Sequence, residues 1–143
     1  MPSVELRFSA VPSHVRTARL IASTVGRRSG LDESLVDEVR LAVGEACARA
    51  VGVQRTHGVT DEVVVTFADD HDRFEVTVAD HGQAEAEVAL ADLVEAAEGL
   101  DGTLPAGFGL AVIGSLVDDL DVKSDAEGTV VRMRWPLAAT PKS

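Results

Sequence analysis

The residues of this sequence best suited to chemistry are a carboxylate and a guanidinium four positions apart, Glu45 and Arg49, in a stretch that is otherwise almost wholly apolar. Apolar residues around them recur at helical spacing, and two side chains four residues apart in a helix project side by side. The pair is therefore either an ion pair in solvent, worth roughly 0.2–0.5 kcal/mol, or two functional groups presented together. The spacing leaves both interpretations open.

The helix that carries this pair should be the longest in the chain. Asp32 and Glu33 open it, since acidic residues are favoured in a first helical turn, and it should end near Gly52 to Gly58. Glu45 and Arg49 lie off its expected buried stripe, which consists of Leu35, Val39, Ala42, Val43, Ala46, Ala50 and Val53. The only cysteine, Cys47, falls on or beside this stripe, which predicts a buried thiol and excludes an internal disulfide.

Two glycine motifs form a second group of candidate site residues. Asp80-His-Gly82 follows a predicted strand, and Gly107-Phe-Gly109 opens a predicted helix. Taken alone, the first is an ordinary strand-end turn and the second an ordinary loop-to-helix junction. The polar run at 69–72 is assigned to a solvated turn rather than a metal site, because consecutive residues at a loop tip rarely converge on one ion.

The remaining pattern predicts the elements that must position these residues. Alternating residues at 4–8 indicate a strand, and a helix follows Pro12 and stops at Ser29-Gly30. Strands are expected at 62–67, 73–79, 121–123 and 129–135, a weak helix or mobile segment at 85–98, and a further helix at 107–117. This order predicts an α+β fold, a two-layer α/β sandwich with helices on one face of a mixed, mostly antiparallel sheet. Residues 1–136 should form a single domain, followed by a flexible tail at 137–143.

The net charge of −11 is unevenly distributed along the chain. Residues 1–55 carry eight arginines and six acidic residues, a net charge of +2, whereas residues 56–143 carry a net charge of −13. The acidic total disfavours nucleic acid and anionic membranes as partners. No apolar run reaches the roughly 18 residues of a membrane span, and no signal-peptide pattern opens the chain, so we expect a cytoplasmic protein. The first two helices are the expected docking surface for an acidic partner.

Three stretches, in this order, resemble the nucleotide-binding boxes of the GHKL ATPase superfamily, which contains gyrase, MutL and the histidine kinases. The stretch from Glu45 to Arg49 resembles a helix box in which an Asn follows a Glu by four residues. Asp80-His-Gly82 is similar to the first half of an Asp-x-Gly-x-Gly box, Gly107-Phe-Gly109 to a Gly-x-Gly box, and Gly128-Thr129 to a further family position.

Within that superfamily, residues 3–136 look most like the small anti-sigma factor kinases of Gram-positive bacteria. Phe8-Ser-Ala10, followed nine residues later by Arg19, is similar to these proteins. The resemblance implies that Asp80 accepts a hydrogen bond from the adenine amino group, assisted by Thr129, and that Gly82 lets the backbone approach the base. Gly107 and Gly109 would present backbone N–H groups to phosphate. Glu45 would be the general base for the attacking hydroxyl.

This sequence departs from the family pattern at three places. The family Asn gives an oxygen to Mg²⁺, but Arg49 has no acceptor atom, so the usual Mg²⁺ site should be absent and ATP binding weak. Arg49 either contacts phosphate directly or pairs with Glu45. Ala84 replaces the second glycine of its box, and the segment expected to close over phosphate is acidic without a single Lys or Arg; its acidic residues are Glu85, Glu87, Asp92, Glu95, Glu98 and Asp101.

The function implied is that of an anti-sigma factor. Such a protein binds and inhibits an alternative RNA polymerase sigma factor, in stress response or sporulation, and is released by a STAS-type anti-anti-sigma factor. The resemblance also implies serine/threonine kinase activity toward that antagonist, which the departures predict to be impaired. An active kinase and a nucleotide-sensing or purely protein-binding module are the alternatives. Arg16 and Arg19 on the first helix are the expected partner-binding residues, near the contact of a homodimer.

Overall fold

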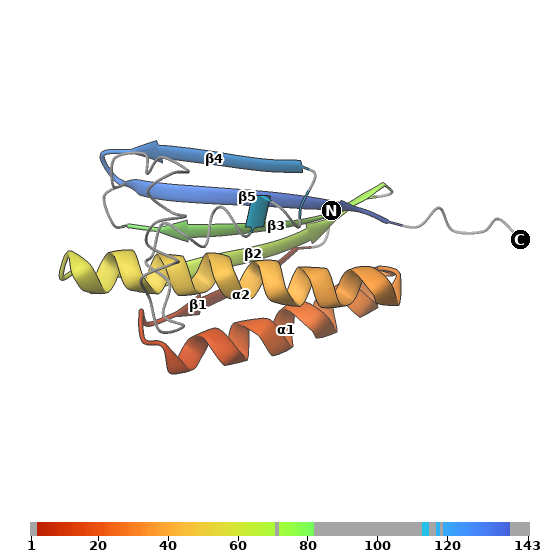
Figure 1. Ribbon diagram of the computed structural model, residues 1–143, viewed down its shortest axis with the longest axis horizontal. Helices are drawn as coiled ribbons and strands as arrows, with labels where there is room; N and C mark the ends of the chain where they lie inside the picture. Colours follow the sequence, from red (N-terminus) through yellow and green to blue (C-terminus); the bar gives the residue numbers. More distant parts are fainter. Residues whose placement is uncertain (1–2, 71, 82–112, 115–116, 118, 138–143) are drawn as a thin grey trace, which may run out of the picture.

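The computed structural model describes residues 3–70, 72–81, 113–114, 117 and 119–137 (Figure 1). These residues form two long helices and five strands. In chain order they are β1 (Ser3–Phe8), α1 (Ser13–Ser29), α2 (Glu33–Thr56), β2 (Val63–Asp69), β3 (Arg73–Asp80), β4 (Asp119–Asp125) and β5 (Gly128–Pro136). Among the described residues, none of the helices is both long enough and apolar enough to cross a membrane.

The five strands form one sheet in the order β1-β2-β3-β5-β4, and each neighbouring pair is antiparallel. Both helices lie along the same face of this sheet (Figure 1). Helix α2 packs on β2 and β3, and α1 packs on α2 and β2. The predicted α+β sandwich is therefore confirmed, with a sheet that is wholly antiparallel in the part of the chain described.

Alternation along the strands places one set of side chains under the helices. In β3 these are Phe74, Val76 and Val78, which are buried while the residues between them are partly exposed. The register puts them opposite Trp135, Met133 and Val131 of β5. The same face of the sheet ends with Asp80 opposite Thr129, and both are buried. A polar pair thus closes an otherwise apolar row.

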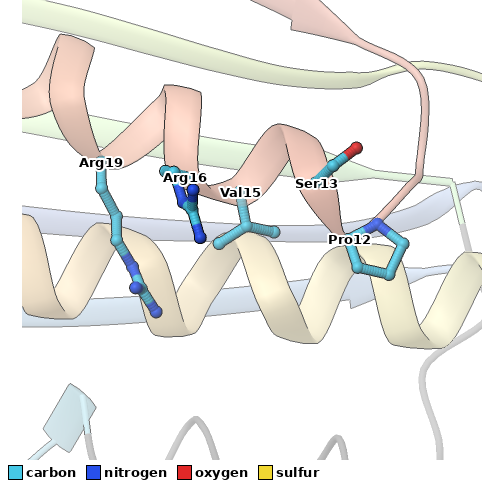
Figure 2. A pocket seen from close by; sticks show the side chains of 5 residues that line it. All are labelled: Pro12, Ser13, Val15, Arg16 and Arg19. Carbon is cyan, nitrogen blue, oxygen red and sulfur yellow. The ribbon is translucent and has the colours of Figure 1, made fainter.

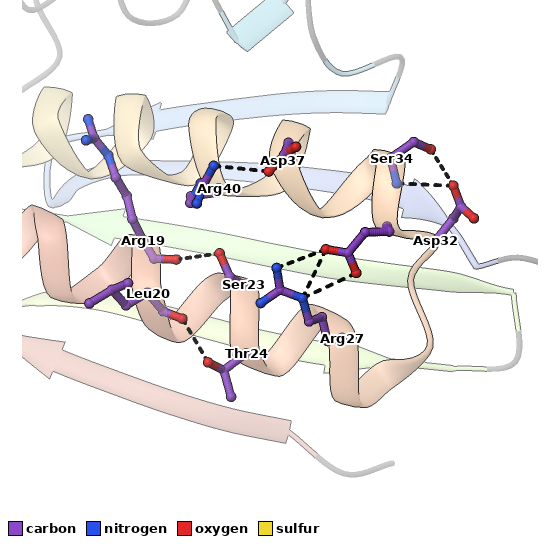
Figure 3. A network of polar contacts seen from close by, with 10 residues as sticks. Arg19, Leu20, Ser23, Thr24, Arg27, Asp32, Ser34, Asp37 and Arg40 are labelled. Atoms are coloured by element: carbon purple, nitrogen blue, oxygen red, sulfur yellow. Dashed lines mark hydrogen bonds and ion pairs between the residues drawn. The ribbon is translucent and has the colours of Figure 1, made fainter.

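The junction between the two helices follows the predicted signals. Gly30 adopts φ 96° and ends α1, a conformation in which glycine avoids a Cβ clash. Asp32 caps α2 by accepting a hydrogen bond from the Ser34 backbone N–H at 3.2 Å. Across the turn, the Nε and Nη2 atoms of Arg27 donate hydrogen bonds to the Glu33 carboxylate (Figure 3). These bonds lower the pKa of the Glu33 carboxyl group.

Helix α2 buries the predicted stripe almost completely. Six of its seven expected residues are buried, and the seventh, Leu35, is partly buried against the core. Burial raises the pKa of the Cys47 thiol to about 12. The helix ends at Thr56, within the predicted range.

Several expectations fall outside the described residues or at their edge. The weak helix at 85–98 and the start of the helix at 107–117 lie outside them. Ile113 is helical, and its carbonyl accepts a hydrogen bond from the Val117 N–H at 3.0 Å, as expected for the last turn of the helix predicted at 107–117. Of the predicted tail, only Leu137 is described; its N–H donates to the Asp72 carbonyl at 2.8 Å, and its side chain packs on the core.

Candidate functional site

Helix α2 and the end of β3 are joined by a buried ion pair. The Arg49 Nη1 atom donates a hydrogen bond to Asp80 Oδ2 at 2.9 Å. The Arg49 side chain is 6% exposed and that of Asp80 is 1% exposed. Charged hydrogen bonds of this length are stronger than neutral ones, and burial weakens the competition from water. The two charges therefore hold helix and strand together at the edge of the core.

This geometry corrects the sequence-based placement of Arg49. The prediction that it lies off the buried surface is wrong, and its ion-pair partner is Asp80 rather than Glu45. The helical pattern could not reveal this, because it compares only residues within the helix. The end of β3 covers this side of α2 and brings a carboxylate 31 positions away in sequence to the guanidinium. Glu45, one turn earlier, is partly buried.

Strand β5 fixes the end of β3 from the other side. Gly128 has φ 150°, and a Cβ atom at this position would lie 1.9 Å from the Asp80 carbonyl oxygen. Only glycine therefore permits this close approach of the two backbones. The next residue, Thr129, is fully buried, and its hydroxyl is 3.0 Å from the Ser124 hydroxyl of β4.

Gln54 completes the connection and was missed by the sequence analysis. Its side chain is fully buried. The Nε2 atom donates to the Asp61 carbonyl at 2.6 Å, and the Oε1 atom accepts from the His81 N–H at 2.8 Å. A polar residue within the apolar spacing of α2 was the available signal. Gln54 thereby holds the chain directly after Asp80 against the end of α2.

Three predicted site residues, Gly82, Gly107 and Gly109, lie outside the described residues. The structure therefore brings together Arg49, Asp80 and Thr129 of the predicted set, with Glu45 on the same helix. Among the described residues, no group of three or more His, Cys, Asp or Glu side chains could hold a metal ion. A guanidinium has no acceptor, so position 49 offers a metal no oxygen.

The predicted partner-binding arginines lie on a second surface, on helix α1. Arg16 and Arg19 line a shallow groove of about 350 Å³ together with Pro12, Ser13 and Val15 (Figure 2). Arg19 extends from α1 across α2, as Figure 2 shows. It crosses at Gly44, where a Cβ atom would lie 2.2 Å from Arg19 Nε. Gly44 thus provides the space in which the Arg19 side chain lies.

Comparison with known proteins agrees with this architecture. Residues 8–135 match the family described as histidine kinase-like ATPase domain. The chain is 30% identical over 135 residues to the serine-protein kinase RsbW of Bacillus velezensis, covering 92% of this chain and 84% of that protein. It is 29% identical to RsbW of Bacillus subtilis with the same coverage.

Solved structures show the same fold. The crystal structure of the RsbU and RsbW domains of a Mycobacterium tuberculosis protein matches with a TM-score of 0.68 and 21% identity, covering 94% of this chain and 32% of that longer one. The catalytic domain of the histidine kinase ThkA matches with a TM-score of 0.51 and 13% identity, covering 96% of this chain and 98% of that one. With the family match and the RsbW relatives, these findings show that the chain belongs to the histidine kinase-like ATPase family, among the relatives of the serine-protein kinase RsbW.

Proposed function

We propose that this protein is an anti-sigma factor that binds and inhibits an alternative RNA polymerase sigma factor and is countered by a STAS-type anti-anti-sigma factor. The observation that carries the proposal is the 30% identity to RsbW over nearly the whole chain. The acidic net charge of −11 supports a protein partner rather than nucleic acid or an anionic membrane. We also propose that the protein acts in the cytoplasm as a homodimer.

The proposed partner surface is the part of α1 around Arg16 and Arg19. Both arginines are exposed and line one groove. They belong to residues 1–55, which carry a net charge of +2 in a chain of net charge −11, so an acidic partner surface is attracted to them. Leu20, the next residue of α1, is 60% exposed. Arginine is among the residues enriched at the hot spots of protein interfaces.

The ATP site of the family is altered in this protein, in our proposal. The Asp80 carboxylate, which the resemblance assigns to the adenine amino group, is bonded to Arg49. Arg49 also stands where the family has its Mg²⁺-binding amide, and it has no oxygen to offer. The described residues therefore bind neither the adenine nor the Mg²⁺ ion of ATP–Mg²⁺ in the way that the resemblance implies for the family. ATP binding should be weak and should depend little on Mg²⁺, which isothermal calorimetry with and without the ion measures.

One observation favours an active serine/threonine kinase as a second candidate. Glu45, the expected general base, is not neutralised by Arg49, whose hydrogen bond goes to Asp80. If phosphotransfer to the antagonist is detected, Glu45→Ala should abolish it with little change in stability. Retention of transfer at the wild-type rate in Glu45→Ala would remove Glu45 as the base.

The anti-sigma proposal is tested by isolating the partners and measuring their affinities. Native pull-down with mass spectrometry should recover a sigma factor and a STAS-domain protein, and surface plasmon resonance then compares variants. Arg19→Ala should weaken binding at least roughly tenfold, as expected for a truncated hot-spot arginine. Arg27→Ala and Arg28→Ala, at the other end of α1, should change it little. Equal affinities for all three variants would contradict the placement of Arg19 in the interface.

A further inference from the structure

Two buried polar links connect α2 to the end of β3, on successive turns of the helix. The first is the ion pair from Arg49 to Asp80 at 2.9 Å. The second is Gln54, which accepts a hydrogen bond from the His81 N–H at 2.8 Å. Two consecutive residues, Asp80 and His81, are therefore bonded to two successive turns of α2. Side chains of the protein itself fix the position of the helix relative to the strand.

The Asp80 carboxylate has little freedom to leave this arrangement. Its backbone is in contact with Gly128, where a single added carbon would clash at 1.9 Å. The following residue is held by Gln54. Because strand β3 is fixed on both sides, the carboxylate remains directed at Arg49. A ligand that needs this carboxylate must displace the guanidinium rather than move the strand.

Displacement by a neutral donor is unfavourable. An adenine amino group would replace a charge-assisted hydrogen bond with a neutral one, which is about half as strong. It would also leave the Arg49 charge buried without its partner, which is among the largest penalties in a protein interior. Arg49 therefore acts as a specificity-determining residue that excludes adenine from Asp80.

Helix α2 also contacts the proposed partner surface, which belongs to α1. Arg19 of α1 lies over Gly44, five residues before Arg49 on α2. Helix α2 thus contacts both the end of β3, through the ion pair, and the Arg19 side chain of α1. In an ATP-binding relative, the resemblance implies that nucleotide would connect the helix box to the aspartate. Here the direct ion pair makes that connection.

We infer that the Arg49–Asp80 ion pair takes the place of nucleotide in this protein, so that α2 is fixed and partner binding does not require ATP. The inference rests on the proposed anti-sigma function for its partner, but the ion pair itself can be tested on the isolated chain.

The first experiment is a thermal unfolding series with ATP and Mg²⁺, followed by the fluorescence of Trp135, the only tryptophan and a buried one. The wild type should melt at the same temperature with and without ATP–Mg²⁺. Arg49→Asn should melt lower without nucleotide, and ATP–Mg²⁺ should raise its melting temperature, with an affinity at least roughly tenfold above that of the wild type. The control Arg40→Ala removes an exposed arginine of the same helix, which pairs with Asp37 across one turn, and it should melt close to the wild type.

Wild-type ATP affinity equal to or above that of Arg49→Asn would overturn the inference, as would a melting temperature of ligand-free Arg49→Asn equal to the wild type. Should Arg49→Asn fail to fold, hydrogen exchange on the wild type decides. Millimolar ATP–Mg²⁺ should leave the protection of α2 and β3 unchanged, and increased protection would overturn the inference.

The second experiment compares sigma factor binding by the wild type before and after removal of nucleotide with apyrase. Equal affinities support the inference, and a loss of binding reversed by ATP–Mg²⁺ overturns it. An absence of sigma factor binding in both samples would instead refute the proposed function. In that case the ATP titrations still decide whether the ion pair excludes the nucleotide.

Discussion

Two arginine side chains lie on helix α2, one from α1 and one from α2 itself, and they differ in exposure to solvent. Arg19 comes from α1, crosses α2 at Gly44 and remains exposed at the rim of a groove (Figure 2). Arg49 belongs to α2 itself and is buried against Asp80 of β3. One guanidinium stays hydrated in the free protein, and the other has lost its water on folding. The first is therefore available to a partner, whereas the second serves the protein interior.

The difference in exposure decides whether an arginine contributes to partner binding or to stability. An exposed arginine contributes little to stability, typically up to about 1 kcal/mol, but it can form a strong contact when a partner excludes water from it. A buried arginine is tied to its carboxylate, and removal of either leaves an uncompensated charge. Helix α2 connects the two, so substitutions along it can separate stability from recognition.

The largest effect is expected from breaking the buried pair. Arg49→Ala should lower the free energy of unfolding by about 3–5 kcal/mol, because the buried Asp80 carboxylate would lose the charge of the Arg49 guanidinium. The exposed control Arg40→Ala, which removes an ion pair with Asp37, should cost about 1 kcal/mol or less. Urea unfolding followed by Trp135 fluorescence measures both variants. A similar loss of unfolding free energy in both variants would contradict a larger contribution of the buried ion pair to stability.

A smaller effect is expected from Gly44→Ala, which tests the exposed arginine without touching it. The new Cβ atom would lie 2.2 Å from Arg19 Nε, so the flexible side chain must move aside. Sigma factor affinity should fall as in Arg19→Ala, roughly tenfold or about 1.4 kcal/mol. Stability should stay equal or rise by up to about 1 kcal/mol, since alanine favours a helix over glycine.

The double variant Gly44→Ala with Arg19→Ala distinguishes displacement of Arg19 from a separate effect of residue 44. It should bind no more weakly than Arg19→Ala alone, because both changes remove the same contact. Additive losses in surface plasmon resonance would mean that Gly44 contacts the partner independently of Arg19.

The smallest effect concerns Cys47, which lies on α2 between the positions of the two contacts. Burial raises the pKa of its thiol to about 12, from an ordinary value of 9.0. The folded chain keeps the proton while the unfolded chain loses it above pH 9, so stability is lost as the pH rises through this range. The expected loss is on the order of 1 kcal/mol at pH 9.5. Cys47→Ala should remove this part of the alkaline decline in urea unfolding, and an unchanged decline would contradict the burial effect.

The sequence by itself determined the layers of the fold and the order of its motifs. The apolar spacing of α2 and the alternation of β2, β3 and β5 each depend on neighbours along the chain, and the structure confirms them. The replacement of the family asparagine by Arg49 was also visible in the sequence, because the box that shows it lies within one stretch of the chain. It predicted that the metal-binding amide of the family is missing, but it left the partner of the guanidinium open between phosphate and Glu45.

Only the tertiary structure decided that partner. Asp80 is 31 positions from Arg49, and no helical or strand period relates the two. The sequence showed Gln54 as a polar residue within the apolar spacing of α2, but it could not show the partners of this side chain. Its two hydrogen bonds go to backbone atoms of Asp61 and His81 rather than to a recognisable side-chain motif. Ion pairs and buried hydrogen bonds form where separate elements meet. Their partners are set by packing, since burial removes the water that would otherwise satisfy each charge alone.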